Sequence, residues 1–282
     1  MAGYDDILAV EWDDNAVETL RVNWPDLDIY HGDIAKLTVE EVLRRTGLAV
    51  GELDLLDGSP PCQGFSTAGK RMMDDPRNQL FREYVRLLRG LRPKVFVMEN
   101  VSGMVKGKMK LVFVEILKEL KASGYRVKAC LLNAKYFHVP QSRERMIFIG
   151  VRDDLGVEPS HPKGESRGII VRDALQNSGH VDSPVLSSLY QRYWLAAPMG
   201  GVVGKLNQVR KLNLHEVSAT LVKSEGNGAP YHPIECRAIS TNERKRLASF
   251  PDMYTFVNRE SATERIGNSV PPLMAEAIAR HI

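Results

Sequence analysis

Hydrophobic positions in the first half of the chain fall into short β-rich runs separated by longer amphipathic stretches. Apolar runs predict strands at 7–10, 28–30, 53–56, 95–98, 127–132 and 146–151. Apolar residues at three- and four-residue spacing predict helices at 15–23, 39–45, 78–88 and 110–121. This alternation is typical of an α/β fold with a parallel or mostly parallel sheet of the doubly wound type.

The alternation stops at about residue 152. Residues 153–236 are rich in Gly, Pro and Ser and contain few helical signals, which predicts a small domain of irregular or β structure. A helix at 241–248, a turn at 267–272 and a helix at 273–282 with proline in its first turn are expected to follow. We therefore expect a catalytic domain at 1–152, to which 262–282 returns, and an inserted domain at 153–261.

Composition narrows the class of protein. The 282 residues are 43% hydrophobic and 26% charged, which suits a folded globular chain. The net charge of +3 permits a polyanionic partner without requiring one. The three cysteines form neither a disulfide framework nor a zinc pattern, and the scattered histidines predict no metal site. With no signal peptide and no membrane-length apolar run, a cytoplasmic location is expected.

Candidate chemistry gathers at one edge of the predicted sheet. Two prolines in Gly58–Ser66 end the preceding strand and hold Cys62 at its carboxyl end, where ligands bind in such sheets. Glu11, Asp33 and Glu99 also directly follow predicted strands. A lone cysteine is usually a core residue and a lone acid usually a helix cap, but their gathering favours a site. A partly buried Glu99 would have a raised pKa and could donate a proton.

Seven ordered blocks resemble the motifs of the cytosine-C5 DNA methyltransferase family. They cover nearly the whole chain except about 153–225, and their order makes the resemblance far more specific than a lone Pro-Cys pair. The blocks are Glu11-Trp12, Gly32-Asp33-Ile34, Pro61-Cys62-Gln63, Glu99-Asn100-Val101, Gln141-Ser142-Arg143-Glu144-Arg145, Arg237 with Glu243, Arg246-Leu247 and Phe250-Pro251-Asp252, and Gly267-Asn268-Ser269-Val270-Pro271.

The resemblance implies a Rossmann-like methyltransferase sheet with an inserted target-recognition domain. It implies methyl transfer from S-adenosyl-L-methionine to C5 of a flipped-out cytosine in double-stranded DNA, in the manner of restriction–modification enzymes. Cys62 would add to C6 of the base and Glu99 would meet N3. Arg145 would lie near O2, with Arg143 supporting the site.

The resemblance also assigns binding roles. Cofactor contacts are expected from Glu11, Trp12, Asp33, Ile34, Pro60, Asn268 and Val270. A mobile loop from Gln63 to Arg77 is expected to close over the flipped base, and the expected DNA contacts are Gln63, Ser66, Lys70, Arg71, Arg77, Arg210 and Arg237. Residues 153–236 carry eight Lys/Arg against nine Asp/Glu and so form no basic patch. Loops at 205–211 and 224–231 are expected to reach base edges.

One family motif is not found. The family begins with a strand and turn of Asp-x-Phe-x-Gly-x-Gly type, central in the sheet between the strands at 7–10 and 53–56. Three explanations are open: a misassigned start or cut chain, a second chain that supplies the segment, or an inactive relative. The chain alone is expected to bind cofactor poorly and to be inactive. The alternative functions are a partner-dependent DNA-binding subunit or a tRNA methyltransferase, although Gln63-Gly64 is unusual for the tRNA branch.

Overall fold

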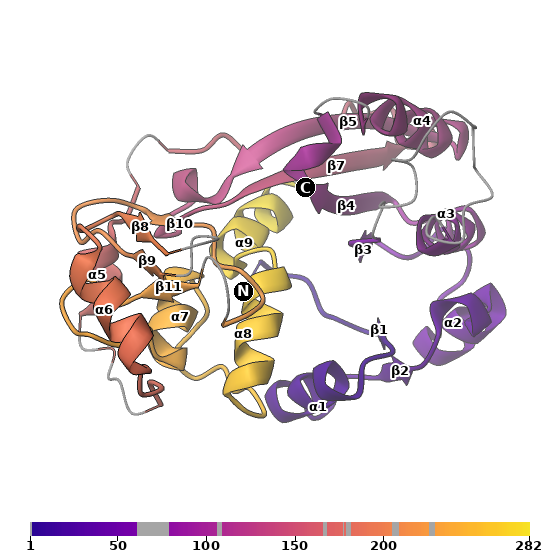
Figure 1. The fold of residues 1–282 in the computed structure, drawn as a ribbon. Coiled ribbons are helices and arrows are strands. Elements are labelled where there is room, and N and C mark those ends of the chain that lie inside the picture. Colours follow the sequence, from indigo (N-terminus) through magenta and orange to yellow (C-terminus); the bar gives the residue numbers. More distant parts are fainter. Residues whose placement is uncertain are drawn as a thin grey trace.

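In the described residues the main sheet has four strands, one of which carries Glu99 near its carboxyl end. The computed structural model describes residues 2–60, 79–105, 109–165, 168–176, 178, 182–204, 209–225 and 229–282. Strands β3 (Leu55–Gly58), β4 (Val95–Val101), β7 (Glu144–Arg152) and β5 (Tyr125–Asn133) lie in the order β3-β4-β7-β5 (Figure 1).

The pairing of these strands corrects one expectation. β3, β4 and β5 run in one direction, but β7 runs antiparallel to its neighbours β4 and β5, so the described sheet is mixed rather than fully parallel. The connection between β5 and β7 explains the difference. It contains only η5 (Ala134–Tyr136) and the short strand β6 (Gln141–Ser142), whereas a parallel return needs a crossover of a dozen or more residues.

Helices cover both faces of the sheet, as expected for the α/β class. On one face, α3 (Gln79–Leu91) and α4 (Met109–Ala122) form a core with Phe96, Met98 and Phe148. On the other face, α9 (Pro272–His281) packs against Val97 and its neighbours. Successive residues of β4 point to opposite faces, which explains this division. The C-terminal helix therefore returns to the sheet, as the sequence predicts.

Strands β1 (Ala9–Glu11) and β2 (Ile29–His31) form a separate parallel pair. Figure 1 shows β1 and β3 as the facing edges of the pair and the main sheet. Within the described residues, β1 pairs only with β2 and β3 only with β4. β3 has no fully buried residue, whereas β4 has five, so β3 has the burial of an edge strand rather than of a central one. Within the described residues, the facing edges of β1 and β3 therefore pair with no further strand.

The β1–β2 pair is held in place by its helices. It is followed by α1 (Asp14–Asn23), η1 (Ile34–Lys36) and α2 (Val39–Thr46). On one side, Arg86 of α3 donates to the carbonyls of Ile34 and Leu37 at 3.0 and 2.7 Å. On the other side, Asn23 and Thr255 exchange two hydrogen bonds. The position of the pair therefore does not depend on hydrogen bonds between β1 and β3.

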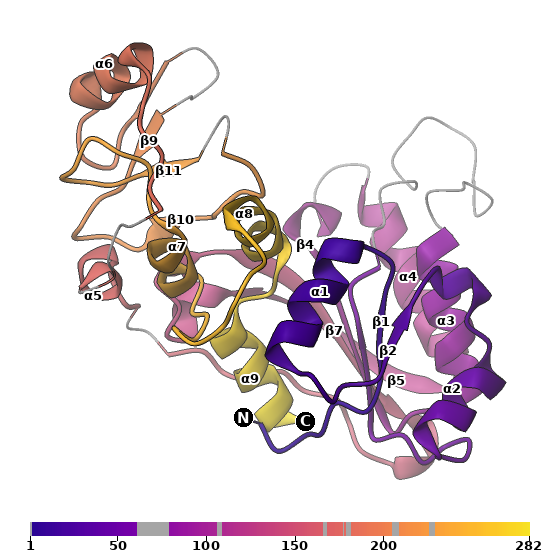
Figure 2. The ribbon, with the colours of Figure 1, turned by 90° about the horizontal axis from the view of Figure 1, so that it is seen from below.

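The inserted region has its own small sheet and two helices. Strands β11 (Pro230–Tyr231), β9 (Val209–Lys211) and β8 (Val202–Val203) pair in that order, and β10 (Ser218–Ala219) pairs with β6. Helices α5 (Val171–Leu175) and α6 (Ser188–Ala196) contradict the expectation of purely irregular or β structure. α6 is stabilised by tertiary packing, because Trp194 is buried and its indole N–H donates to the His232 carbonyl. Figure 2 shows α6 at the far end of this region from the main sheet.

The remaining elements are α7 (Thr241–Leu247), α8 (Arg259–Asn268), η4 (Ser102–Val105) and η6 (Asp153–Leu155). The predicted turn at 267–272 is wrong at its start, because Gly267 and Asn268 form the last turn of α8. The side chain of Asp13 caps α1, since it accepts from the N–H of Ala16. Among the helices described, none combines the length and the apolar character needed to cross a bilayer.

Glu243 at the start of α7 gives a stability prediction. It forms a capping box with Ser240 and a forked ion pair with Arg237 at 2.7 Å, and its side chain is almost fully buried. We expect Glu243→Gln to lower the free energy of unfolding by about 3 kcal/mol, because the Arg237 cation then loses its buried carboxylate and keeps only the half-exposed Glu235. Urea unfolding measures this change. Glu264→Gln, in an exposed pair with Arg265, is the control and should cost under about 1 kcal/mol.

The stability difference should also depend on pH. Burial raises the pKa of Glu243, but the hydrogen bonds from Arg237 and the Ser240 N–H outweigh it and hold the pKa below the usual 4.5. A lowered folded-state pKa stabilises the protein above that value, and the contribution is lost as the pH falls through the folded pKa. The gap between wild type and Glu243→Gln should therefore shrink below about pH 4.5. A gap that does not change with pH would contradict this account.

Candidate active site

A buried ion pair lies where β4 and β7 meet at the expected edge. Arg145 Nε is 2.6 Å from Glu99 Oε1, and both side chains are about nine-tenths buried. In the antiparallel register, Arg145 lies opposite Val101, two residues from Glu99 on the same strand. Residues two apart on a strand share a face, which explains why the two side chains meet. The structure therefore brings together two of the four predicted catalytic residues.

The surroundings of Glu99 favour its protonated form more than water does. Burial raises the pKa of Glu99, while the charges of Arg145 and Arg143 and a hydrogen bond with the Ser59 hydroxyl oppose the rise without cancelling it. Burial also lowers the pKa of Arg145, so the pair is held in a poorly hydrated place. A carboxyl group with a raised pKa keeps its proton to higher pH than an exposed glutamate and can donate it to a neighbouring acceptor.

The turn before Cys62 is tied to the same edge. Asn100, which follows Glu99 and is buried, donates from Nδ2 to the Pro60 carbonyl at 2.9 Å. Its Oδ1 accepts from the Val101 N–H, also at 2.9 Å. The backbone two residues before Cys62 is thus fixed beside Glu99. The predicted residues Cys62, Gln63, Ser66, Lys70, Arg71 and Arg77 themselves lie outside the described residues and stay predictions.

Arg143 contributes in a different way from Arg145. Its side chain is 1% exposed, and its two terminal nitrogens donate to the carbonyls of Leu221 and Gly267 at 3.1 and 2.7 Å. Burial, together with the charge of Arg145, lowers the pKa of Arg143 to about 9, so it stays a cation at neutral pH. These contacts make Arg143 a link between β7 and the segments that carry Leu221 and Gly267, and no contact places it against a base.

A second group of predicted residues meets at the carboxyl ends of β1 and β2. Glu11 lies opposite His31 in the register, and its carbonyl accepts from the Gly32 N–H at 2.9 Å, which brings Asp33 nearby. Glu11 Oε1 accepts from the N–H groups of Trp12 and Asp13, and Asp33 Oδ1 caps η1. The helix-cap interpretation thus accounts for one oxygen of Asp33. The indole of Trp12 is 76% exposed and offers a bare aromatic face.

Comparison with known proteins settles the family. The chain matches the C-5 cytosine-specific DNA methylase family over residues 1–182 and 176–282. The chain belongs to this family. It is 33% identical over 307 residues to the Type II methyltransferase M1.HphI of Haemophilus parahaemolyticus, covering 100% of this chain and 81% of that protein. It is 31% identical over 353 residues to M.DdeI of Desulfomicrobium norvegicum, covering 100% and 84%.

Solved structures agree with this assignment. A protein described as a DNA modification methyltransferase encoded within an E. coli prophage superposes with a TM-score of 0.84 and 25% identity, over 99% of this chain and 92% of that one. The Dnmt2 methyltransferase of S. pombe, at 20% identity and a TM-score of 0.68 over 97% of this chain and 88% of that one, shares the fold. The predicted methyltransferase fold and family are thus confirmed.

The other predicted residues of this methylase have varied surroundings. Pro60 is buried, Asn268 is exposed at the end of α8, and Val270 packs against the core beneath α9. Arg210 lies half-buried in β9. Arg237 is committed to Glu243 and Glu235, and its guanidinium is mostly buried, so its geometry suits a structural ion pair better than the expected DNA contact.

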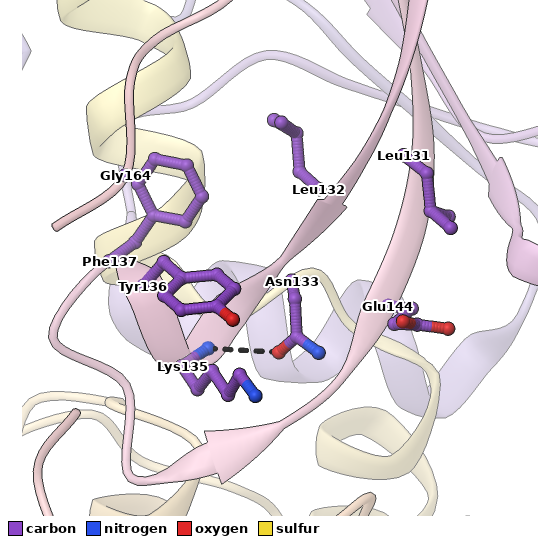
Figure 3. A pocket seen from close by; sticks show the side chains of 8 residues that line it. All are labelled: Leu131, Leu132, Asn133, Lys135, Tyr136, Phe137, Glu144 and Gly164. Atoms are coloured by element: carbon purple, nitrogen blue, oxygen red, sulfur yellow. Dashed lines mark hydrogen bonds between the residues drawn. The ribbon is translucent and has the colours of Figure 1, made fainter. Parts of the chain in front are cut away.

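The described residues also form a cavity away from the Glu99–Arg145 pair. The structure forms a cavity of about 270 Å³ at the end of β5, lined by residues that include Asn133, Tyr136 and Glu144 (Figure 3). It contains neither Glu99 nor Arg145. No group of three or more metal-ligating side chains gathers in the described part of the chain. Cys130 packs against the core beneath α9, and Cys236 is exposed.

Sequence reasoning missed several residues that shape the site. It assigned no role to Asn100, although that residue lies in a recognised block, nor to Ser59. It also missed Thr220 and Leu221, which contact the Gln141–Arg143 stretch through the Thr220 hydroxyl and the Leu221 N–H and carbonyl. Thr220 and Leu221 lie in the region that matched no recognised block, so only the folded structure could associate them with the site.

Proposed function

We propose that this protein methylates C5 of cytosine in double-stranded DNA through a covalent adduct between Cys62 and C6 of a flipped-out base. The observation that carries the proposal is the buried Glu99–Arg145 pair beside the fixed turn that precedes Cys62. The names of the relatives support a role in a Type II restriction–modification system, in the cytoplasm of a bacterial cell.

The chain's own residues can be given balanced roles. The Cys62 thiolate forms a bond to C6, and the electron pair of the C5–C6 double bond moves toward N3 and O2 of the ring. Glu99 donates its proton to N3, and the Arg145 cation stabilises charge at O2. C5 is then nucleophilic and gains the methyl group. Loss of the C5 proton to a base expels the thiolate, and the N3 proton returns to Glu99, which restores the enzyme.

S-adenosyl-L-methionine, as the family implies, would supply an electrophilic methyl group when bound. The residues at the ends of β1 and β2 fit its adenosine half. The exposed indole of Trp12 offers a stacking face for adenine. Glu11 and Asp33 each have one oxygen engaged by backbone N–H groups, and the second oxygen can accept from ribose or amino groups. Ile34, Pro60, Asn268 and Val270 complete the proposed contact set.

We further propose that an additional strand and glycine-rich turn, in the same polypeptide or in a second chain, completes the cofactor site. In the described part of the chain, the facing edges of β1 and β3 pair with no further strand, which supports this proposal. They also favour the alternative that residues 1–282 act only with a partner. The third explanation, an inactive relative, predicts that completing the sheet restores nothing.

DNA recognition is proposed for residues 153–261, with the loop from Gln63 to Arg77 closing over the base and Arg210 contacting the backbone. Cys62 through Arg77 and the stretch at 205–208 lie outside the described residues. The proposed domain boundary at residue 261 falls within α8. The target sequence follows from none of these features.

Trapping with 5-fluorocytosine tests the function, because fluorine at C5 blocks the final elimination and leaves the adduct in place. With cofactor and the completing strand present, we expect a protein–DNA adduct that survives denaturation and is absent in Cys62→Ala. Substituted RNA distinguishes the tRNA alternative. No adduct with either nucleic acid, despite restored cofactor binding, would refute methyltransferase activity and favour the DNA-binding role.

A further inference from the structure

The segment Ser218–Glu225 is here called the strap. It lies between the Gln141–Arg145 stretch and the rest of the proposed recognition region (residues 153–261). At its first end, β10 pairs with β6, and the Ser218 N–H donates to the Pro140 carbonyl. The Thr220 hydroxyl donates to the Ser142 carbonyl at 2.7 Å. The strap therefore begins against the residues that lead directly into Arg143 and Arg145.

Two buried side chains hold the middle of the strap. The Leu221 N–H donates to Gln141 Oε1 at 3.0 Å, and the Leu221 carbonyl accepts from Arg143. Gly267 of α8 lies so close to Lys223 that a Cβ there would fall 2.3 Å from the Lys223 Cα. This close packing leaves the strap little freedom to shift against β7 and α8.

The second end of the strap is held by charge. Glu225 pairs with Arg244 of α7 at 3.2 Å and with Arg259 of α8 at 3.1 Å, and it accepts from the Thr263 hydroxyl at 2.8 Å. Three side chains from two helices thus converge on one carboxylate. The next described residue after Glu225 is Ala229, which is buried against Trp194 and Tyr231 in the recognition region.

Arg244 makes this contact unusually demanding. Its side chain is 1% exposed, and burial lowers its pKa. Glu225 is the one carboxylate with which it forms an ion pair in the described part of the chain, and its Nε and Nη1 have no hydrogen-bond partner there. A buried cation is stabilised mainly by its counter-charge, so the position of Glu225 is tightly specified.

We propose that Glu225 is a positioning residue for DNA recognition. It fixes the strap, so that the segments that recognise the target sequence keep a constant position relative to the Arg143–Arg145 strand. This inference rests on the proposed function. Removing the Glu225 carboxylate should release the second end of the strap, while Arg143 still holds the middle of the strap. Sequence discrimination should therefore fall while non-specific DNA binding, which depends on surface cations, stays unchanged.

The test is binding-site selection from a randomised duplex DNA library with the purified chain, which needs no methyl transfer. We expect the wild type to enrich one sequence and Glu225→Gln to discriminate it from single-base variants at least about tenfold less well. Binding to non-specific duplex should change by less than about twofold. Asp182→Asn is the matched control, because Asp182 pairs with the same Arg259 but lies off the strap, and it should select as the wild type does.

Glu225→Asp provides a second variant, since it keeps the counter-charge of Arg244 but shortens the reach by one methylene. It should remain folded and also lose discrimination. If either folded variant discriminates as the wild type does, the proposal is overturned. If both variants unfold while Asp182→Asn stays folded, Glu225 is structural alone and the proposal is again overturned. If the wild type enriches no sequence, the proposed DNA recognition itself fails, which is a distinct outcome.

Discussion

Replacing Glu99 with glutamine is expected to lower the rate of methyl transfer by about two to four orders of magnitude. The amide keeps the shape of the side chain but cannot donate an acidic proton to N3 of cytosine. It also leaves the buried cation of Arg145 without a counter-charge, since Arg145 Nε lies 2.6 Å from the carboxylate in the wild type. Single-turnover methylation of duplex DNA measures the effect. The assay uses the form of the protein that methylates DNA, which is either residues 1–282 alone or residues 1–282 with the completing strand.

The pH dependence gives a more specific signature of the same role. Burial raises the pKa of Glu99, so its protonated fraction persists to higher pH than that of an exposed glutamate. If protonated Glu99 is the acid, the wild-type rate should fall as the pH rises through this raised pKa. The residual rate of Glu99→Gln should lack that decline, because glutamine does not titrate.

Glu144→Gln is the matched control for Glu99. Glu144 lies on β7 directly before Arg145, but its side chain is exposed and on the opposite face of the strand. Its replacement should leave the rate within about twofold of the wild type. A folded Glu99→Gln enzyme with less than a tenfold loss would contradict the assignment of Glu99 as the acid.

Much of this architecture could be predicted from local sequence patterns. The apolar runs located β4 and β7 within a few residues, because a strand's side-chain alternation is a local property. The caps formed by Asp13 and Ser240 are local in the same way, since a cap contacts N–H groups only two or three positions away. The ion pair between Glu99 and Arg145 could be expected only through the family motifs, which associate residues distant in sequence.

What the sequence did not reveal depends on distant contacts. Arg143 bonds to carbonyls 78 and 124 residues away, and no periodicity encodes such a pairing. Arg237 was expected to contact DNA, yet its guanidinium pairs with Glu243 and Glu235. The antiparallel direction of β7 depends on the length of a connection that contains no helix. Helix α6 is stabilised because Trp194 is buried against β9 and β11. The local sequence of α6 does not predict this packing.

The second large effect concerns the edges of β1 and β3. We expect residues 1–282 alone to bind S-adenosyl-L-methionine with a Kd weaker than about 1 mM, and a chain joined to a completing strand and glycine-rich turn to bind about a hundredfold or more tightly. The β1–β2 pair, which carries the proposed adenosine contacts, is held in place by α1, α3 and α8. Its position therefore does not depend on the added strand. Isothermal titration calorimetry measures both affinities. The strand and turn can be supplied as a segment of the Asp-x-Phe-x-Gly-x-Gly type with which the family begins.

A proline-substituted version of the same segment is the control, because proline has no N–H with which to pair a strand edge. Hydrogen exchange gives an independent readout. The Ala9 N–H donates to the carbonyl of Asp28, directly before β2, so the next N–H along, that of Val10, points toward the open edge. Its exchange should slow when the added strand inserts and should not change with the proline version. Micromolar binding of S-adenosyl-L-methionine by residues 1–282 alone would refute the proposal that a strand is missing between β1 and β3. Slowed Val10 exchange without cofactor binding would show that the strand inserts but does not complete the cofactor site.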